Sequence, residues 1–221
     1  MDIVSYLLGK QTSGGGGLDW SAIGYSEEPQ VIQDGYNYAV EIKNNWTPSI
    51  NLALRYSHDY NLSFMPFVDT SIATTMQGMF SYSYGLISVP LFNTSNVINM
   101  REMFRGCRAL KTVPQFDTSK VTTIYGMFND CISLKTLPLL DTGALNTGSS
   151  INSVFVNCLN LSDQSLDNIL QMCINATSLP SSVPKTLFNL GITSTTAYPA
   201  SRIQALPHYQ DFIDAGWTMG Y

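Results

Sequence analysis

Charged side chains are scarce in this chain of 221 residues, because Asp, Glu, Lys and Arg together make up 12% of it, about half of the ~25% that is typical of globular domains. The 11 Lys and Arg residues form no basic run, so the chain lacks the electrostatic footprint of a nucleic-acid binder. The sequence predicts no nucleic-acid partner. It also predicts a surface kept soluble mainly by hydroxyl and amide groups, which is more typical of adhesive or particle-forming proteins than of cytosolic enzymes.

Long apolar runs are absent as well. No stretch approaches the ~20 apolar residues that span a membrane, so no membrane association is predicted. The apolar stretch at residues 3–8 is too short for a signal-peptide core, and Asp2 precedes it where a basic residue is expected. We therefore expect a chain that is not secreted by a signal of its own.

Cysteine pairs with metal-ligand spacing are missing. The four cysteines include no C-x-x-C pair, and His58 and His208 lie near no such pair, which argues against zinc. Cys107, Cys131 and Cys158 occupy one position of a repeat, where a disulfide framework would not place them. We expect buried, stacked thiols in a chain assembled in a reducing cytoplasm.

A repeat with a period of 24 residues organises the middle of the chain. Each unit has a leucine, a proline, an Asp/Asn-Thr-Ser/Gly triplet and a Met-Phe pair; the pair returns as Val154-Phe155 after an insertion near residues 146–150. The prolines are Pro66, Pro90, Pro114 and Pro138, and the leucines are Leu62, Leu86, Leu110, Leu134 and Leu161. A fixed period of this length is typical of a solenoid, in which stacked units bury equivalent residues against one another.

Each unit is predicted to contain a strand, a corner and a short helix. The proline cannot donate to a strand ladder and is expected at a strand end. Asp117 is a candidate N-cap, and the apolar residues that follow it over 121–128 have helical spacing. The predicted fold class is an α/β repeat solenoid, with short parallel strands stacked in one sheet, short helices opposite, and caps at both ends.

The predicted organisation has five parts. They are a docking peptide at residues 1–10, a glycine-rich linker at 11–17, an N-terminal cap at 18–61, a repeat body at 62–161 and a C-terminal cap at 162–221. The N-terminal cap ends in a degenerate first repeat, in which Leu52 and Tyr56 align with Met76 and Phe80.

The two ends carry further expectations. The N-terminal peptide is either a frayed terminus or a segment that docks on another subunit through Ile3, Val4, Tyr6, Leu7 and Leu8. In the C-terminal cap we expect a helix capped by Ser162, a strand over 186–190, and a last helix over 201–215 that Pro207 starts or kinks. Gly216 is expected just beyond the end of that helix.

No residue pattern indicates catalysis. His58-Asp59 has no accompanying nucleophile motif, so we predict no catalytic residue and no enzyme activity. The row of Asp69, Asn93, Asp117 and Asp141 has an alternative interpretation as a cation ladder, but Asn93 interrupts it and capping already explains it. Neither a metal nor a cofactor is predicted.

A binding surface is easier to support. The residues after each opening leucine are expected beside the strand, with at least one of each pair facing outward, although a plain solvated face is an equal alternative. The candidate ligand-binding residues of this strand-side row are Ser63, Phe64, Ser88, Lys111, Thr112, Lys135 and Thr136. Tyr82 and Tyr84 are not required by the repeat core and are further candidates for contact with a sugar or a protein.

The units at residues 116–122, 127–128 and 131–134 resemble the BspA-like leucine-rich repeats of bacterial surface proteins and mycoplasma lipoproteins, over roughly residues 50–161. This resemblance implies a leucine-rich-repeat solenoid used for binding. The ends, residues 1–17 and 214–221, resemble short tail or minor structural proteins of phages and prophages of Gram-positive and gut bacteria.

These resemblances together imply a non-enzymatic virion protein, tail-associated or particle-decorating, that presents a repeat body for binding. Its expected partners are other virion structural proteins, through the N-terminal peptide, and a glycan or protein of the host surface. It would assemble in the host cytoplasm. The sequence leaves open whether the chain forms a homo-oligomer. The alternative is an adhesin or interaction module on a bacterial cell surface.

Overall fold

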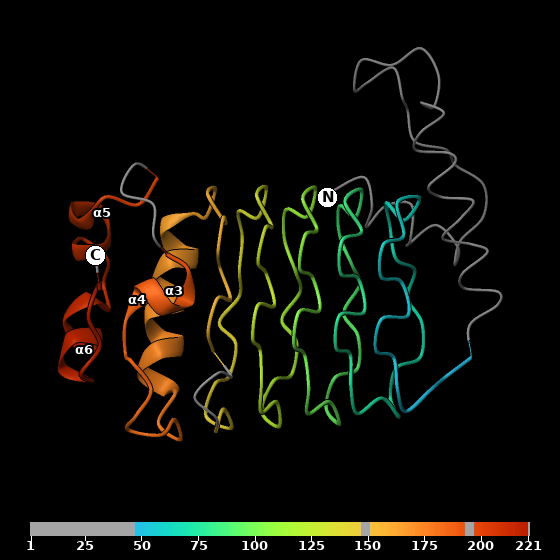
Figure 1. The fold of residues 1–221 in the computed structure, drawn as a ribbon, viewed down its shortest axis with the longest axis horizontal. Helices are drawn as coiled ribbons and strands as arrows, with labels where there is room; N and C mark the ends of the chain where they lie inside the picture. The colour runs from blue at the N-terminus through green and yellow to red at the C-terminus, as the bar shows by residue number, and fades with distance from the viewer. Residues whose placement is uncertain (1–46, 147–150, 193–196, 221) are drawn as a thin grey trace, which may run out of the picture.

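A computed structural model of the chain describes residues 47–146, 151–192 and 197–220. Successive turns of the chain, which we call coils, lie side by side in one stack, and the helices, which follow the coils in sequence, lie at the C-terminal end of the stack (Figure 1). The predicted docking peptide and linker, most of the predicted N-terminal cap, and residues 147–150 of the insertion fall outside the described residues.

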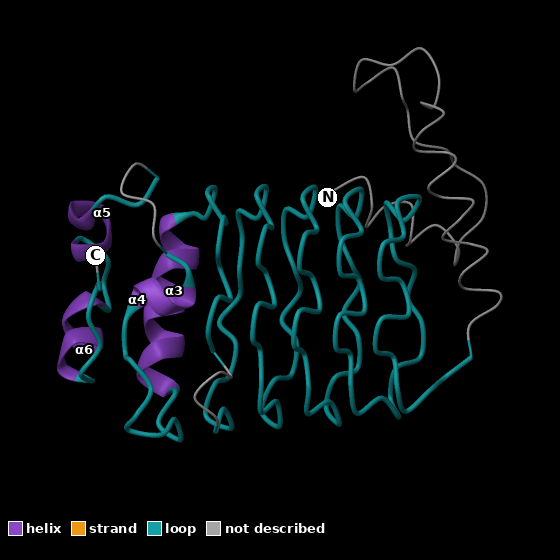
Figure 2. Cartoon of the chain, viewed as in Figure 1, coloured by secondary structure: helices purple, strands orange, loops and turns teal. Residues whose placement is uncertain are grey.

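Backbone pairing joins equivalent positions of neighbouring coils. One row of parallel bridges links Asn51, Thr75, Asn99 and Thr123, each 24 residues from the next. Bridges at two other points, between Phe64 and Ser88 and between Thr112 and Thr136, join the coils along a second row. The sequence predicts multi-residue strands, whereas the described coils pair through these single-residue bridges and are drawn without arrows (Figure 2).

Consecutive tight turns stand where the sequence predicts short helices. In the stretch 76–83 the amide of Ser81 donates to the carbonyl of Gly78, three residues back (3.0 Å), whereas the amide of Gly78 donates to the carbonyl of Arg101 in the next coil (2.8 Å). Positive φ angles at Gly78 (57°) and Tyr82 (62°) interrupt any helix there. A helix would use those amides internally. In the described part of residues 62–161 the prediction of short helices is therefore corrected to turns whose spare amides join the coils.

Aromatic rings form a column through the core. Phe80, Phe104, Phe128 and Phe155 stack in nearly parallel pairs, with ring centroids 5.6, 5.7 and 5.9 Å apart. All four are fully buried, so the prediction that equivalent apolar residues bury one another is confirmed. Tyr56 continues the column, 6.0 Å from Phe80, which confirms its predicted alignment with that residue.

The three cysteines at one repeat position are buried free thiols, as predicted. Each Sγ donates to a phenylalanine carbonyl oxygen of the preceding coil: Cys107 to Phe80 (3.1 Å), Cys131 to Phe104 (3.0 Å) and Cys158 to Phe128 (3.1 Å). Burial raises the pKa of all three thiols. They pack as small apolar groups that each satisfy one backbone carbonyl.

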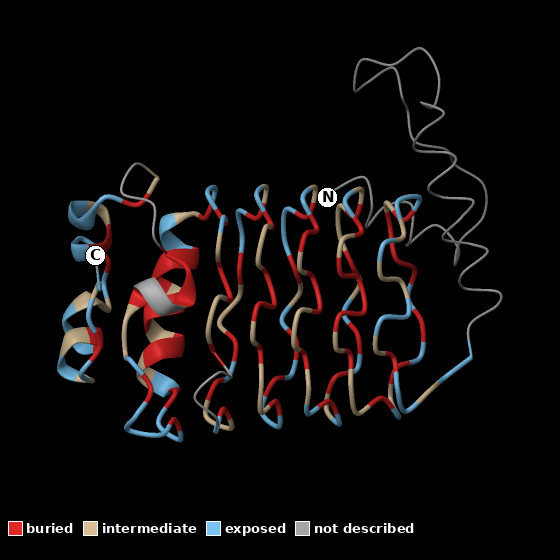
Figure 3. Cartoon of the chain, in the orientation of Figure 1, coloured by how far each residue is buried: buried red, intermediate tan, exposed pale blue. Residues whose placement is uncertain are grey.

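Helix α3 (Asp163–Asn175) takes the place of a further coil. Ser162 caps it, as predicted, because its Oγ accepts a hydrogen bond from the amide of Ser165 (3.2 Å). Leu166 and Ile169 belong to a buried face, and much of the helix is enclosed by the rest of the fold (Figure 3). An amphipathic helix can cover the apolar end of the stack without offering another row of unpaired backbone groups.

The remaining C-terminal elements differ from the predictions. The predicted strand over 186–190 is helix α4 (Leu187–Leu190) preceded by a single bridge between Thr186 and Thr218. The predicted last helix is two helices, α5 (Ala200–Gln204) and α6 (Tyr209–Asp214), because Pro207 lies between them and lacks the amide that a continuous helix needs. Gly216 follows α6 with a φ of 82°, as predicted for that position.

None of the helices among these described residues is long and apolar enough to cross a membrane.

Candidate functional site

The later half of the predicted strand-side row is exposed. Lys111, Thr112, Lys135 and Thr136 all face solvent, and Thr112 pairs with Thr136 in a parallel bridge. The amide of Lys135 donates to the carbonyl of Lys111 (2.9 Å), so the two coils stay in register here. These four side chains therefore form a small polar and basic strip.

The earlier half of the same row is more enclosed. Phe64 is buried, in contrast to its prediction as a ligand-binding residue, although it does not belong to the main apolar core of the coils. Its bridge partner Ser88 is half-buried, with a hydroxyl group that is enclosed and has no hydrogen-bond partner among the described residues. Ser63 is half-buried and its carbonyl accepts from the amide of Ile87 (2.9 Å). The strand-side row is thus no continuous exposed stripe.

Tyr82 and Tyr84 belong to a larger group that we call the aromatic cluster, made of His58, Tyr60, Tyr82 and Tyr84. Tyr84 stacks on Tyr60 with ring centroids 5.5 Å apart, and Tyr82 lies 4.9 Å from the ring of His58. The two predicted tyrosines meet edge to face at 6.3 Å. Tyr60 is 62% exposed and Tyr84 40% exposed, so the cluster presents aromatic surface to solvent.

Two arginines extend the aromatic cluster. The guanidinium of Arg108 lies 5.1 Å from the ring centroid of Tyr84, and that of Arg105 lies 5.5 Å from the ring centroid of Tyr82. Arg105 is also held by Glu102 at 3.0 Å. A cation over an aromatic face is attracted by the ring quadrupole. The arrangement therefore places positive groups beside the rings of Tyr82 and Tyr84.

The 24-residue register explains why these residues meet. Tyr60, Tyr84, Arg108 and Ile132 occupy one repeat position, and Leu159 follows after the insertion. All five are exposed, and we call them the corner row. Tyr60 and Arg108 are not among the site residues predicted from the sequence. The signal that would have found both is the repeat period, because they lie 24 residues before and after Tyr84.

A glycine makes room for Tyr82. Gly106 occupies the equivalent position in the next coil with a φ of 74°, and a Cβ atom there would lie 2.7 Å from Cδ1 of Tyr82. The ring of Tyr82 therefore lies directly against the backbone of the next coil, a contact that only glycine permits. This contact limits the freedom of the Tyr82 ring within the aromatic cluster.

The predicted capping row forms local turns rather than helix caps. Oδ1 of Asp69, Asn93, Asp117 and Asp141 accepts from the amide two residues later, at 2.9, 3.2, 3.1 and 2.8 Å. Hydrogen bonds from Ser71 and Ser119 lower the pKa of the Asp69 and Asp117 carboxyls. Among the residues that the structure describes, no group of three or more His, Cys, Asp or Glu side chains is placed to hold a metal ion.

Residues of the predicted docking peptide, Ile3 to Leu8, lie outside the described residues. The candidate site among the described residues consists of the aromatic cluster, its two arginines and the corner row.

Part of the chain matches a known protein family. Residues 65–169 match the family described as "Mycoplasma protein of unknown function, DUF285". The matched segment covers most of the repeat body and the first half of α3, and it is similar to a BspA-like, mycoplasma-type repeat family. No curated protein and no solved structure matches the chain.

Proposed function

We propose that this chain is a non-enzymatic binding protein, with a leucine-rich-repeat type of solenoid as its body, and that it recognises a protein partner through the aromatic cluster and Arg108. The observation that carries the proposal is the exposed stack of Tyr60 on Tyr84 with Arg108 beside it. Tyrosine and arginine, together with tryptophan, are the residue types enriched at the energetic centres of protein interfaces.

The arrangement is suited to binding because it is ordered and still exposed. Rings that already stack on one another lose little conformational freedom when a partner covers them. Covering the exposed parts of Tyr60 and Tyr84 removes apolar surface from water, while the hydroxyl groups keep polar contacts available. The buried columns of Phe and Cys are already fully occupied in holding the coils together. The corner row is not part of those columns.

The solenoid part of the proposal is supported by the pairing between coils. Bridges connect residues 24 positions apart along two rows of the stack, and each coil contributes one ring to the aromatic column. A body of this kind displays equivalent side chains in lines. The corner row is such a line, extended along the stack.

Two locations are proposed for the protein. The first is a phage or prophage virion, supported by the sequence of the two ends, with the N-terminal peptide as the attachment to other virion proteins. The second is a bacterial cell surface, as an adhesin, and it is supported by the match of residues 65–169 to a mycoplasma family. Mass spectrometry of purified particles and of peptides released from intact cells by trypsin distinguishes them: detection in only one of the two fractions identifies the location and contradicts the other.

The binding test uses the fluorescently labelled full chain on a panel of intact Gram-positive, gut and mycoplasma cells. We expect saturable binding to at least one strain that proteinase K abolishes and periodate oxidation of glycans does not. The double variant Tyr84→Ala/Arg108→Ala should lose at least tenfold in affinity, the effect of removing an interface centre worth about 2 kcal/mol.

The matched control is Ile50→Ala/Leu91→Ala, which removes two exposed apolar side chains outside the aromatic cluster and should bind as the parent does. Equal binding by the Tyr84→Ala/Arg108→Ala variant and the parent would contradict the proposed site. Binding that survives proteinase K but not periodate would replace the protein partner with a glycan.

A further inference from the structure

A row of buried threonines links the coils at a position next to the Asp/Asn turns. Thr70, Thr94, Thr118 and Thr142 are each at most 2% exposed. In three of the four, Oγ1 donates to a backbone carbonyl of the following chain segment: Thr70 to Asn93 (2.9 Å), Thr94 to Asp117 (2.9 Å) and Thr142 to Met172 (2.6 Å). A buried hydroxyl group normally has such a partner.

Thr118 is the exception in this row. Its repeat-equivalent acceptor would be the carbonyl of Asp141, but Oγ1 of Thr118 is buried and has no hydrogen-bond partner among the described residues. A cavity of about 660 Å³ opens at this point, lined by residues 115–119 of one coil, 139–141 of the next, and Asn175 at the end of α3. The missing hydrogen bond and the cavity therefore occur at the same junction, one coil before the helix replaces the repeat.

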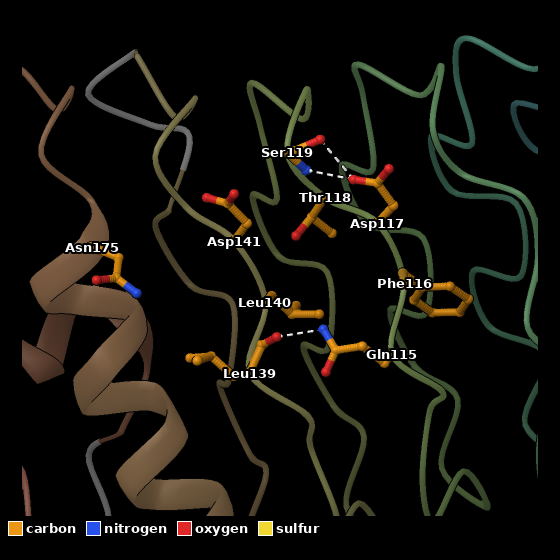
Figure 4. Close-up of a pocket in the computed structure, with 9 residues that line it drawn as sticks. All are labelled: Gln115, Phe116, Asp117, Thr118, Ser119, Leu139, Leu140, Asp141 and Asn175. Carbon is orange, nitrogen blue, oxygen red and sulfur yellow. Dashed lines mark hydrogen bonds between the residues drawn. The ribbon is translucent and has the colours of Figure 1, made fainter.

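The cavity is bounded by polar groups from both coils (Figure 4). The oxygen of Thr118 is directed toward the coil of Asp141, and the amide of Asn175 lies on the helix side. Gln115 crosses one edge, where its Nε2 donates to the carbonyl of Leu139 (2.5 Å). The cavity falls in the size range of ~300–1,000 Å³ that is usual for sites of small organic ligands, and it is too large for a single metal ion.

The lining is rich in hydrogen-bond acceptors. Asp117 and Asp141 use Oδ1 in their local turns, which leaves Oδ2 of each carboxylate for another donor. None of the nine lining residues is basic, so the site does not suit an anion. Phe116, Leu139 and Leu140 also line the cavity, but only Leu139 is partly exposed. The lining thus combines acceptors, one unpartnered hydroxyl and one accessible apolar side chain.

We propose that this cavity is a binding site for a hydroxyl-rich saccharide, a mono- or disaccharide unit, with Thr118, Asp117 and Asp141 as the residues that contact its hydroxyl groups. Sugar hydroxyls donate to the two carboxylates, the hydroxyl of Thr118 donates to a sugar oxygen, and the C–H face of the ring lies on the side chain of Leu139. This site shares no residue with the aromatic cluster, so a test of saccharide binding here is independent of the proposed protein-binding function.

The first measurement compares Thr118→Val with Thr94→Val in the full chain. Valine keeps the shape of threonine and removes the hydroxyl. Because the Thr118 hydroxyl has no partner, Thr118→Val should leave the melting temperature unchanged or raise it. Thr94→Val should lower it, since it removes an existing hydrogen bond. If both variants lose the same number of degrees, Thr118 is a structural residue and the proposal is overturned.

The second measurement is saccharide binding by saturation-transfer NMR followed by calorimetry. The ligands are glucose, galactose, mannose, N-acetylglucosamine, maltose and lactose, each at millimolar concentration. At least one should bind the parent, and its affinity should fall about two- to tenfold in Thr118→Val, the loss expected for one hydrogen bond. Thr94→Val should bind as the parent does.

Asp141→Asn tests the charge, because asparagine keeps the Oδ1 acceptor that the local turn needs. It should weaken saccharide binding at least as much as Thr118→Val does, with an unchanged melting temperature. Absence of binding by all six saccharides overturns the proposal. So does a rise in melting temperature with calcium chloride or spermidine alone that Asp141→Asn abolishes, because the cavity would then be a cation site.

Discussion

At the scale of single residues, the buried thiols show how the repeat uses small polar groups. Cys107, Cys131 and Cys158 each fill an apolar position and donate a weak hydrogen bond to a carbonyl of the preceding coil. Cys173 in α3 is buried in the same core. Desolvation raises the pKa of all four thiols well above the ordinary value of ~8.5.

This burial predicts a pH dependence with a definite sign. Above pH ~8.5 the unfolded chain loses thiol protons while the folded chain keeps them, so the free energy of unfolding should fall as pH rises, by up to about 1.4 kcal/mol per pH unit for each thiol. Below pH ~8.5 the thiol contribution should be fully present. Urea unfolding between pH 8 and 10 measures this slope, and Cys131→Ala should make it shallower.

Reactivity gives an independent check on the same thiols. All four cysteines should resist Ellman's reagent in the native protein at pH 8 and react fully in urea. A Lys135→Cys variant, which adds an exposed thiol, should react at once with a single equivalent. Rapid modification of the native parent chain would show that the thiol column is accessible and would contradict the packing described above.

At the scale of elements, the stack ends where α3 replaces a coil and the C-terminal helices cover α3. Asp167 of α3 is buried and accepts from Nδ1 of His208 (2.7 Å) and from the backbone amide of the same residue (3.0 Å). Gln171 donates to the same carboxylate (3.2 Å). One side chain thus joins α3 to the start of α6.

Replacement of Asp167 tests this junction. Asp167→Ala should lower the free energy of unfolding by about 1–3 kcal/mol, because it removes a buried acceptor that three part-buried donor groups share. The control is Asp163→Ala on the same helix. Asp163 pairs with Arg202 at 2.7 Å, but its side chain is 68% exposed, so its removal should cost no more than about 1 kcal/mol. Equal losses in chemical denaturation would show that Asp167 does not hold the junction.

The elements also show how far sequence reasoning extends. The Phe and Cys columns and the Ser162 cap could be predicted, because each depends on a period or on a cap close in sequence. The turns at 76–83 could not, since apolar residues spaced three and four apart satisfy a helix and a row of turns equally well. The two differ in where the amides donate, and that depends on the neighbouring coil. The strand predicted over 186–190 is wrong for a related reason: five residues are too few for a periodicity to separate α4 from a strand.

The candidate site was predictable only in part. Tyr82 and Tyr84 stand out because they depart from the repeat. Tyr60 lies in the degenerate first unit, where the period is hard to see. Arg108 is a single charged residue whose sequence neighbours do not mark it as part of a site. Their stacking on Tyr84 depends on the three-dimensional register. The Thr118 cavity could not be found from sequence, because Thr118 is identical in type to the other threonines of its row and differs only in its missing partner.

At the scale of the whole molecule, the repeat is a scaffold whose recurrent residues are used for packing and for turns. Phenylalanines and thiols hold the centre, Asp and Asn form the turns, and threonines join neighbouring coils. The features proposed to bind ligands occur where this regularity changes: large exposed side chains along the corner row, and the junction at Thr118 where one hydrogen bond of the row is missing.

We infer that hydrogen bonds between coils in a 24-residue register hold this scaffold together. Amide hydrogen exchange of the full chain by NMR tests it most directly. The amides of Gly78, Glu102 and Gly126 donate to carbonyls of the next coil at 2.8, 2.8 and 3.0 Å, and they should exchange only through large-scale unfolding, as slowly as the amides in the middle of α3. Exchange of these three amides within seconds, while α3 stays protected, would show that these hydrogen bonds do not hold the coils together.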